Sequence, residues 1–518
     1  MKQKNNSRTF LAFRNVIVTT FVMILNFPIQ FVNRYFMVRY LGITYLGLTS
    51  LFSNILSVLS LADLGIGTSI VFLLYKPLAV KDIKKISIIM KYYRRIYQAI
   101  AVVIFGLGLI ILPFLHYFIG SKINYPNVYL LFLIYLLGSA SSYLFSYNQS
   151  LLYADQKNHI VSWISLFVTY IMLIAQIISV VTTKNSILYA LLYVFSGFIT
   201  NLIVTIYVNK LYKFNWKIKD KLERKEKKLL IHNVIGNMFL RVSGVIVTAT
   251  DNIFLSAFAG VNAVGFYANY VTIVNVIQKI ITQAIGSVTG SIGNFIIQKK
   301  VGESKKLFFD LQFINFIFVS MASLGIYFVC DDVISIWLGS KFVIDRLDVL
   351  LIALSFYFMN YRMVGWNFIS VYGLAQFMKV FSINEIIANL GFTFVFLYFF
   401  KLKLTGVLLG TICSTLFTVT WQDPYIIFRH AFNTAPWEYY IKYIYNILIL
   451  GIEYLILNNI FMFINQTKQI LIIRICLKAF IVVFASIGLP YLFYLKQHET
   501  KYLRELFFKL IRGVRSDT

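Results

Sequence analysis

The sequence predicts an all-α membrane protein with about fourteen transmembrane helices. Of its 518 residues, 59% are hydrophobic and only 13% are charged, whereas a soluble domain carries roughly 25% charged residues. The mean hydropathy of +0.76 agrees with this composition. The apolar residues fall into long runs separated by short basic segments, and a helix of about 20 apolar residues spans a bilayer. We therefore expect lipid, rather than water, to surround most of the chain.

Fourteen apolar runs are long enough to cross a membrane as helices. They lie near residues 13–38, 45–74, 96–117, 128–147, 160–181, 187–208, 229–257, 263–295, 307–329, 347–372, 377–400, 404–428, 439–463 and 470–495. The run at 263–295 is longer than one crossing requires, so we expect part of it to extend beyond the lipid. A single run is compatible with a buried helix of a soluble protein, but fourteen in succession are not.

The net charge of +28 raises the question of nucleic-acid binding, and the placement of the charges argues against it. With the N-terminus in the cytoplasm, most of the 48 Lys and Arg residues fall on the cytoplasmic side, as the positive-inside rule requires. The largest clusters are the segments 76–95 and 210–228 and the tail after Leu495. Basic clusters of this kind face anionic lipid headgroups. We expect a multi-pass plasma-membrane protein with both termini in the cytoplasm and no nucleic-acid partner.

The residues that usually carry catalysis or bind metals show no pattern. The three cysteines are odd in number and lie in or beside apolar runs, so they predict no disulfide framework. The five histidines lack metal-ligand spacing, and the chain has no Gly-rich phosphate loop and no obvious nucleophile motif. We therefore expect no enzyme activity, no metal and no organic cofactor.

An internal repeat divides the chain. An ungapped offset of 218 residues places Arg14-Asn15-Val16-Ile17 over His232-Asn233-Val234-Ile235, and Leu41-Gly42 with Gly47 over Ala259-Gly260 with Gly265. The offset spans six helices, an even number, so both units enter the membrane in the same direction and form parallel repeats. We expect a first lobe at 1–215, a second lobe at 216–435, and an appendage of two helices with a basic cytoplasmic tail at 436–518.

Polar residues form a stripe along the first helix of each lobe. On a helix, positions three, four and seven apart share one face. The first stripe consists of Asn15, Thr19, Asn26, Gln30, Asn33 and Arg34, and the second of Asn233, Asn237, Arg241, Thr248, Asp251 and Asn252. Polar groups without partners are costly in lipid, so both stripes face inward. Hydrogen bonding between packed helices is the alternative for a single Asn. Two stripes that both carry charge favour a water-filled cavity between the lobes.

The charged residues within the predicted helices indicate the preferred substrate. They are Asp63, Arg241, Asp251, Lys279, Arg362, Glu385 and Lys478, with Arg34 towards the outer end of the first helix. Each costs about 2.5 to 3.5 kcal/mol at the bilayer centre, so each is paired, buried or in contact with cavity water. The basic residues outnumber the acidic ones around the predicted cavity, which suits an anionic headgroup, and the planar fork of Arg suits phosphate.

Three of the basic residues have alternative interpretations. Arg362 is spaced to form an ion pair with Glu385 on the next predicted helix. Arg34 lies close enough to the outer end to extend towards the interface. Lys478 belongs to the appended pair of helices, and we expect it to be structural.

Several motifs resemble a known family of transporters. In the first lobe they are the turn from Leu41-Gly42 to Leu46-Gly47, Leu59-Ser60-Leu61-Ala62-Asp63-Leu64-Gly65-Ile66-Gly67 and Tyr75-Lys76-Pro77-Leu78; in the second lobe they are Asp251-Asn252-Ile253-Phe254 with Gly265-Phe266-Tyr267, and later Arg362, Gly373, Glu385, Asn389, Gly406-Val407, Leu409-Gly410-Thr411 and Trp421-Gln422-Asp423-Pro424. Together they resemble the Wzx-type oligosaccharide flippases of capsule and exopolysaccharide loci, especially those of Gram-positive bacteria. The resemblance covers residues 14 to 440. Where relatives more often carry Glu, this chain has Asp63.

The resemblance implies a fold and a transport cycle. That family belongs to the superfamily of multidrug, oligosaccharidyl-lipid and polysaccharide (MOP) exporters, which also holds the MATE multidrug exporters and the lipid II flippases. It implies two six-helix lobes around a central cavity that opens alternately to each side. The implied substrate is an undecaprenyl-diphosphate-linked oligosaccharide that moves from the cytoplasmic to the outer leaflet. Polysaccharide polymerase and glycosyltransferases are the implied partners, besides membrane lipids.

The predicted roles follow from side-chain chemistry. We expect the basic residues Arg34, Arg241, Lys279 and Arg362 to bind the diphosphate, and the neutral side chains Asn26, Gln30, Asn237 and Thr248 to bind sugar hydroxyls. Asp63, Asp251 and Glu385 are candidates for proton or sodium coupling, because the chain shows no ATP site. The alternatives are a cation-coupled MATE-type drug exporter, a lipid II flippase, and a membrane-embedded glycosyltransferase or polymerase. The last would need a large outer loop, and the longest predicted one, near Gly339 to Arg346, is short.

Overall fold

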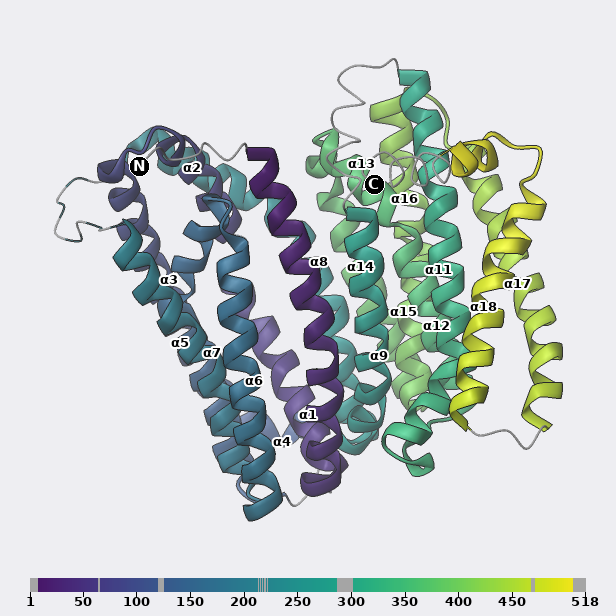
Figure 1. Ribbon diagram of the computed structural model, residues 1–518, viewed down its shortest axis with the longest axis horizontal. Coiled ribbons are helices and arrows are strands. Elements are labelled where there is room, and N and C mark those ends of the chain that lie inside the picture. Colours follow the sequence, from purple (N-terminus) through teal and green to yellow (C-terminus); the bar gives the residue numbers. More distant parts are fainter. Residues whose placement is uncertain are drawn as a thin grey trace, which may run out of the picture. The chain divides into compact units, whose positions relative to one another are not determined.

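The structure is a computed structural model, and its described part is helical. It describes residues 8–63, 66–119, 125–212, 222–286, 301–466 and 471–505, together with positions 214, 216, 218 and 220. Within these residues the chain forms α-helices with short 3₁₀ and π segments and no β-strand (Figure 1). The predicted all-α class is therefore confirmed.

The helices follow the order of the predicted apolar runs. Their bounds are α1 Arg8–Leu59, α2 Ile66–Ala79, α3 Ile83–Ile111, α4 Leu115–Ile119, α5 Val128–Ala154, α6 Asn158–Thr183, α7 Ser186–Tyr212, α8 Arg224–Ala259, α9 Val261–Gly286, α11 Val301–Trp337, α12 Arg346–Tyr361, α13 Met363–Val371, α14 Met378–Tyr398, α15 Lys403–Phe417, α16 Val419–Ile427, α17 Trp437–Gln466 and α18 Leu471–Phe493. Residues 287–300, the end of the predicted run 263–295, lie outside the described residues.

Eleven helical segments within the described residues are long and apolar enough to cross a membrane. The number is smaller than fourteen partly because α1 contains two predicted runs that join at a kink, where Gly42 has φ 87° and ψ 170°. Helices α8 and α9 match the predicted seventh and eighth runs but are absent from the eleven. Asn, Gln and Thr interrupt α9, and only the end of α8, Gly244–Ala259, appears as a shorter apolar helix.

Three predicted runs are interrupted at a polar or charged residue, and a fourth, 96–117, is interrupted by the 3₁₀ turn Leu112–Phe114 between α3 and α4. The run 45–74 was predicted as one helix, but α1 ends at Leu59 and a 3₁₀ turn, Ser60–Asp63, precedes α2. The run 347–372 breaks at Arg362 between α12 and α13, and the run 404–428 breaks at Thr418 between α15 and α16. Hydropathy does not detect these breaks because the flanking residues are apolar on both sides. The first two breaks carry charged residues, Asp63 and Arg362.

The chain divides into two compact units, Met1–Ala268 and Asn269–Thr518. In the first unit, α5 packs between α3 and α7, and α1 packs against α6 and α8. In the second, α11 packs against α12 and α18, and α14 packs against α15. The predicted lobes are defined by the sequence repeat, whereas these two units are defined by their compactness. The predicted lobe boundaries therefore stay a prediction.

The predicted repeat is visible in the backbone of the first unit. Gly260, the counterpart of Gly42 at the offset of 218, also has a positive φ, of 89°. The contact that follows each glycine is reciprocal. A Cβ on Gly47 would lie 2.0 Å from the Val261 carbonyl oxygen, and a Cβ on Gly265 would lie 2.5 Å from the Ile43 carbonyl oxygen.

Between these two close approaches, the Thr44 hydroxyl donates to Asn262 Oδ1 at 2.8 Å, and these two residues are themselves 218 positions apart. Thr44 and Asn262 are repeat equivalents, and the offset of 218 converts the Gly47–Val261 contact into the Gly265–Ile43 contact, which is the pattern of a local two-fold contact. The glycines are needed because the two backbones touch there.

Candidate functional site

The first polar stripe begins with a structural contact. Asn15 is buried, and its Nδ2 donates to the backbone oxygen of Gln156 at 2.6 Å. The ring Nδ1 of His159 lies 2.8 Å from Asn15 Oδ1. The side chain thus fastens the start of α1 to the turn between α5 and α6. Hydrogen bonding between helices, the alternative considered for a single Asn, applies at this position.

Further along the stripe, Asn26 and Gln30 are only partly buried. Asn26 Nδ2 donates to the Val22 carbonyl oxygen within its own helix at 3.0 Å. Among the residues that the structure describes, neither amide bonds to another helix. Both amides therefore keep donors and acceptors for a further partner, as the prediction of sugar binding requires.

Arg34, near the end of this stripe, has tyrosines as neighbours. It is half-buried, and Tyr135 of α5 and Tyr189 and Tyr193 of α7 lie close enough for electrostatic interaction with it. The Tyr189 hydroxyl donates to Asn33 Oδ1, and the Tyr135 and Tyr193 rings are 5.6 Å apart. Sequence reasoning missed these tyrosines. Tyr189 and Tyr193 are four residues apart, so the one available signal was that they share a face of α7.

Asp63 ends the 3₁₀ turn between α1 and α2 and lies among phenol groups. The Tyr97 side chain hydrogen-bonds with its carboxylate, and Tyr93 is close enough to interact with its charge. A Cβ on Gly67 would lie 3.0 Å from the hydroxyl oxygens of both tyrosines, so the glycine makes room for them. A carboxylate beside hydroxyls at a broken helix is the kind of site where transporters bind sodium ions or protons.

The second stripe lies on α8 and is only partly described. The side chains of Asn237 and Arg241 lie outside the described residues, although both positions are helical. Thr248 is exposed, and its hydroxyl donates to the Gly244 carbonyl oxygen at 2.8 Å. Asp251 is buried, with 8% exposure, and Tyr267 of α9 lies near it. Asp251 therefore lies in a protein interior, and its coupling role stays a prediction.

Arg362 lies in a buried ion-pair network. Its Nε is 2.8 Å from Asp423 Oδ2 and its Nη1 is 3.1 Å from Glu385 Oε1. The guanidinium also stacks over the Trp366 ring at 4.8 Å from the ring centre. The alternative of an ion pair with Glu385 is confirmed, and Asp423 is a second partner that sequence reasoning missed. Two carboxylates leave this group with an excess negative charge, so Arg362 adds little to an anion-binding surface.

Lys279 and Lys478 have opposite environments. Lys279 is exposed on α9 and forms no ion pair with any residue that the structure describes. Lys478 is buried on α18, and its Nζ is 2.7 Å from Asp332 Oδ2 of α11. Arg474 contacts the other oxygen of Asp332 at 2.8 Å. The structural role expected for Lys478 is confirmed, because this group joins α18 to α11.

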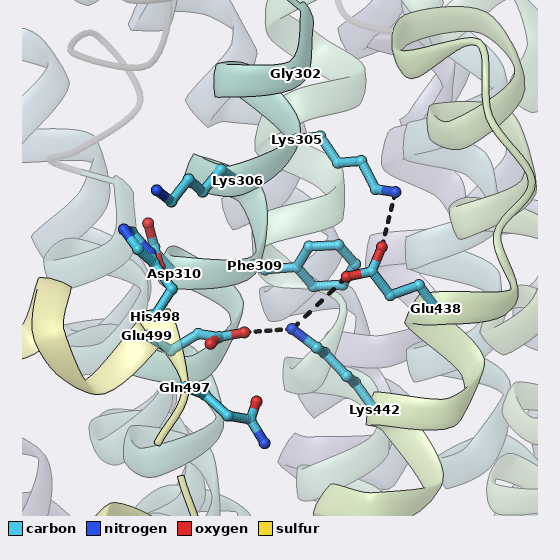
Figure 2. A pocket seen from close by; sticks show the side chains of 10 residues that line it. All are labelled: Gly302, Lys305, Lys306, Phe309, Asp310, Glu438, Lys442, Gln497, His498 and Glu499. Atoms are coloured by element: carbon cyan, nitrogen blue, oxygen red, sulfur yellow. Dashed lines mark hydrogen bonds and ion pairs between the residues drawn. The ribbon is translucent and has the colours of Figure 1, made fainter. Parts of the chain in front are cut away.

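A pocket of about 420 Å³ opens where the N-terminal ends of α11 and α17 meet the segment after α18 (Figure 2). Eight of its ten lining residues carry polar or charged side chains: Gly302, Lys305, Lys306, Phe309, Asp310, Glu438, Lys442, Gln497, His498 and Glu499. Lys305 Nζ is 2.7 Å from Glu438 Oε2. In Figure 2 these two side chains face each other across one side of the pocket.

The opposite side of this pocket is also charge-balanced. Lys442 pairs with Glu499, and its Nζ lies 3.9 Å from Glu438 Oε1. His498 Nδ1 lies 2.9 Å from Asp310 Oδ1. Because carboxylates face the lysines, the pocket lacks the excess positive charge expected of a diphosphate site. It is an open, charged pocket at one end of the second unit.

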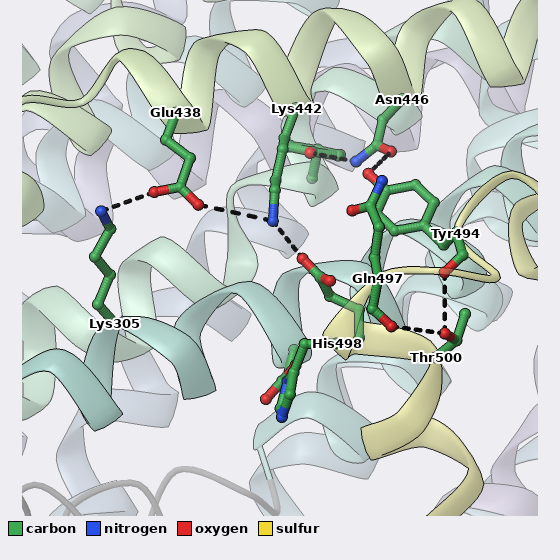
Figure 3. Close-up of polar contacts among 11 residues, drawn as sticks. Lys305, Glu438, Lys442, Asn446, Tyr494, Gln497, His498 and Thr500 are labelled. Carbon is green, nitrogen blue, oxygen red and sulfur yellow. Dashed lines mark hydrogen bonds and ion pairs between the residues drawn. The ribbon is translucent and has the colours of Figure 1, made fainter.

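A hydrogen-bonded chain continues inward from this pocket along α17 (Figure 3). The amide of Asn446 donates to the Tyr361 hydroxyl at 2.8 Å and accepts from the Tyr494 hydroxyl at 2.7 Å. A cavity of about 10 Å³ beside them shares Lys442 and Glu499 with the larger pocket. The spacing of the polar residues along α17 is visible in the sequence, but the sequence predicts no role for the last two helices beyond that of an appendage.

Metal binding finds no support in the described part of the chain. There, no three His, Cys, Asp or Glu side chains are grouped to hold a metal ion. The candidate residues described above carry hydrogen-bonding and charged groups.

One family model matches the chain. It is described as "Polysaccharide biosynthesis protein" and matches residues 12–289, more than half of the sequence. Among curated proteins, none matches this sequence.

Solved structures show the same fold at low sequence identity. A lipid II flippase, MurJ, in an inward closed conformation has a TM-score of 0.66 and 14% identity, covering 93% of this chain and 99% of its own. An inward-facing MATE multidrug transporter of the MOP superfamily has a TM-score of 0.62 and 13% identity, covering 80% and 98%. A MOP superfamily transporter from Pyrococcus furiosus, described by the reverse polarity of its binding pocket, has a TM-score of 0.55 and 11% identity, covering 83% and 99%. The MATE-like fold expected from the motifs is therefore confirmed.

Proposed function

We propose that this chain, which belongs to the family of polysaccharide biosynthesis proteins, is a flippase for lipid-linked oligosaccharides. It is a multi-pass membrane protein with the fold of MOP superfamily transporters. The proposed substrate is an undecaprenyl-diphosphate-linked repeat unit for capsule or exopolysaccharide synthesis. It moves from the cytoplasmic to the outer leaflet of the plasma membrane by alternating access.

The observation that carries this proposal is the first stripe of α1. Asn26 and Gln30 keep free hydrogen-bonding capacity, and Arg34 lies beside tyrosine rings. Amides donate to and accept from sugar hydroxyls, aromatic faces offer apolar contact to sugar rings, and a guanidinium forms a bidentate contact with phosphate. In this proposal Arg34, Arg241 and Lys279 bind the diphosphate.

The extent of the structural matches favours a lipid-linked substrate over a drug. The lipid II flippase aligns with 93% of this chain, more than residues 1–435 alone can supply, so its match includes part of the last two helices. The MATE transporter covers 80%. Because the more extensive match is to a lipid II flippase, lipid II stays the alternative substrate.

Orientation and coupling complete the proposal. The basic segments 76–95 and 210–228 support a cytoplasmic location of both termini by the positive-inside rule. In this orientation α11 and α17 begin on the cytoplasmic side, because an even number of the predicted transmembrane runs precedes each of them. Asp63 and Asp251 are the proposed coupling residues of the first unit, with a proton or a sodium ion as the driving species. Polysaccharide polymerase and glycosyltransferases are the proposed partners.

The experiment that tests the proposal compares substrates in one preparation. The purified protein is placed in vesicles that contain a fluorescent undecaprenyl-diphosphate oligosaccharide or fluorescent lipid II, and the label that an impermeant quencher reaches is followed over time. A third set of vesicles measures accumulation of a cationic dye. We expect movement of the oligosaccharide lipid. Movement of lipid II alone, or of the dye alone, contradicts the proposed substrate.

A further inference from the structure

One buried acid in the last two helices has no part in the function proposed above. Glu453 of α17 has 0% exposure. Neither of its carboxylate oxygens has a hydrogen-bond partner among the described residues. An ionised carboxylate is not tolerated in a protein interior inside the membrane without a partner. Burial without a partner therefore favours the neutral, protonated form of Glu453.

The charged groups on the neighbouring helices are engaged elsewhere. On α11 and α18, Asp332 pairs with Lys478 and Arg474. On α12, Arg346 Nε donates to the Tyr327 hydroxyl of α11 at 2.9 Å. None of these groups compensates a negative charge on Glu453.

Tyr357 of α12 is close enough to Glu453 for an electrostatic interaction. The Tyr357 hydroxyl is also buried without a hydrogen-bond partner in the described residues. A phenol hydroxyl donates and accepts hydrogen bonds, so it can pass a proton between two neighbours. Buried polar groups without a hydrogen-bond partner are uncommon, and each of these two needs an explanation.

Polar side chains lie between Tyr357 and the charged pocket, although the Tyr357 hydroxyl makes no hydrogen bond to a described residue. The Tyr357 and Tyr361 rings are 5.5 Å apart, and Tyr361 accepts a hydrogen bond from Asn446. Asn446 borders the small cavity of about 10 Å³, which adjoins the 420 Å³ pocket through Lys442 and Glu499. Glu453 lies seven residues after Asn446, two turns further along the same face of α17. Figures 2 and 3 show the outer part of this group of side chains, from Lys305 to Asn446 and Tyr494.

We propose that Glu453 is a proton-binding site that exchanges with water through the pocket between α11, α17 and the segment after α18. The proton leaves a carboxylic acid oxygen, passes over the Tyr357 and Tyr361 hydroxyls, and reaches water beside Lys442. The reverse path reloads the acid. The last two helices then take part in proton coupling, on the side of the membrane proposed above to be cytoplasmic. This role goes beyond the proposed function, which assigns coupling to Asp63 and Asp251.

Infrared spectroscopy of the full-length protein in lipid vesicles tests the site directly. At neutral pH the wild type is expected to show the carbonyl band of a protonated carboxylic acid. Glu453→Gln, which is neutral and nearly the same size, loses this band. Glu438→Gln, at the exposed mouth of the pocket, keeps it. If Glu453→Gln keeps the carbonyl band of the wild type, the proposal is overturned.

The route is tested by the rate at which this band shifts after transfer to D₂O. Tyr357→Phe removes a hydroxyl without a partner, so the fold is retained, and exchange is expected to be slower than in the wild type. Tyr445→Phe is the matched control on α17, since its hydroxyl bonds to the Phe493 carbonyl oxygen, and it is expected to exchange at the wild-type rate. Equal rates in all three proteins overturn the route. Neither readout uses a transported lipid, so these results are independent of the flippase test.

Discussion

Replacing Gly47 by alanine is expected to destabilise the reciprocal contact between the two repeats. The added Cβ would lie 2.0 Å from the Val261 carbonyl oxygen and 2.6 Å from Val261 Cγ1, both far inside van der Waals contact. The obstacle is backbone as well as side chain, so a rotamer change does not relieve it. The helices must separate, which costs about 1–3 kcal/mol in a packed interior.

The control separates this clash from the helical preference of alanine. Gly106 of α3 has nothing within 4 Å of an added Cβ, and a helical Gly→Ala change there should stabilise the protein by about 0.5–1 kcal/mol. Thermal unfolding of both variants in one detergent measures the difference. We expect a lower midpoint for Gly47→Ala and an unchanged or higher one for Gly106→Ala. If Gly47→Ala is as stable as Gly106→Ala, the reciprocal contact does not exist as described.

Three further predictions concern buried charges. Arg362→Met leaves Asp423 and Glu385 close together without a cation, which should lower the free energy of unfolding by about 3–5 kcal/mol. Asp423→Asn keeps the pair of Arg362 with Glu385 and should lower it less. Equal midpoints of the two variants in chemical unfolding would refute this order. Asp332→Asn strands the buried Lys478 and should destabilise the protein. Adding Lys478→Met to Asp332→Asn should restore part of that loss, and no recovery would mean that the ion pair is not the cause.

The sequence predicted the helices well because lipid exposure makes long apolar runs unavoidable. It did not predict where helices break, since the residues around Asp63, Arg362 and Thr418 are apolar on both sides. Of these, Asp63 and Arg362 are charged residues that hydropathy averages away. A break between apolar flanks is decided by packing and ion pairing, which one sequence does not display.

The structure changes the predicted site in detail. Polar spacing selects Asn26, Gln30 and Arg34 as one face of α1, and their role stays a prediction, whereas Asn15 on the same face is a helix contact. Arg362 was predicted as an anion ligand, and its carboxylate partner Asp423 was missed because it lies 61 residues away in the sequence. Side chains that meet across such separations are not periodic, so no helical pattern indicates them.

The last two helices were the least well understood from sequence. Glu438, Lys442, Asn446 and Glu453 lie on one face of α17, and their spacing of four, four and seven was readable. Their significance depends on partners from other helices, such as Tyr361 and the segment after α18. The sequence shows the spacing of these residues on α17, and only the fold shows which side chains they face.

Binding of the lipid-linked headgroup at Arg34 is the most direct test of the proposed function. Arg34→Ala removes a charge-assisted contact worth about 1.5–3 kcal/mol, so affinity for a fluorescent undecaprenyl-diphosphate oligosaccharide should fall about 10- to 100-fold. Arg39→Ala, an exposed arginine on the same helix, is the control. We predict weak binding and slow movement between leaflets for Arg34→Ala, with wild-type behaviour for Arg39→Ala. Unchanged binding by Arg34→Ala, with normal folding, would contradict the account.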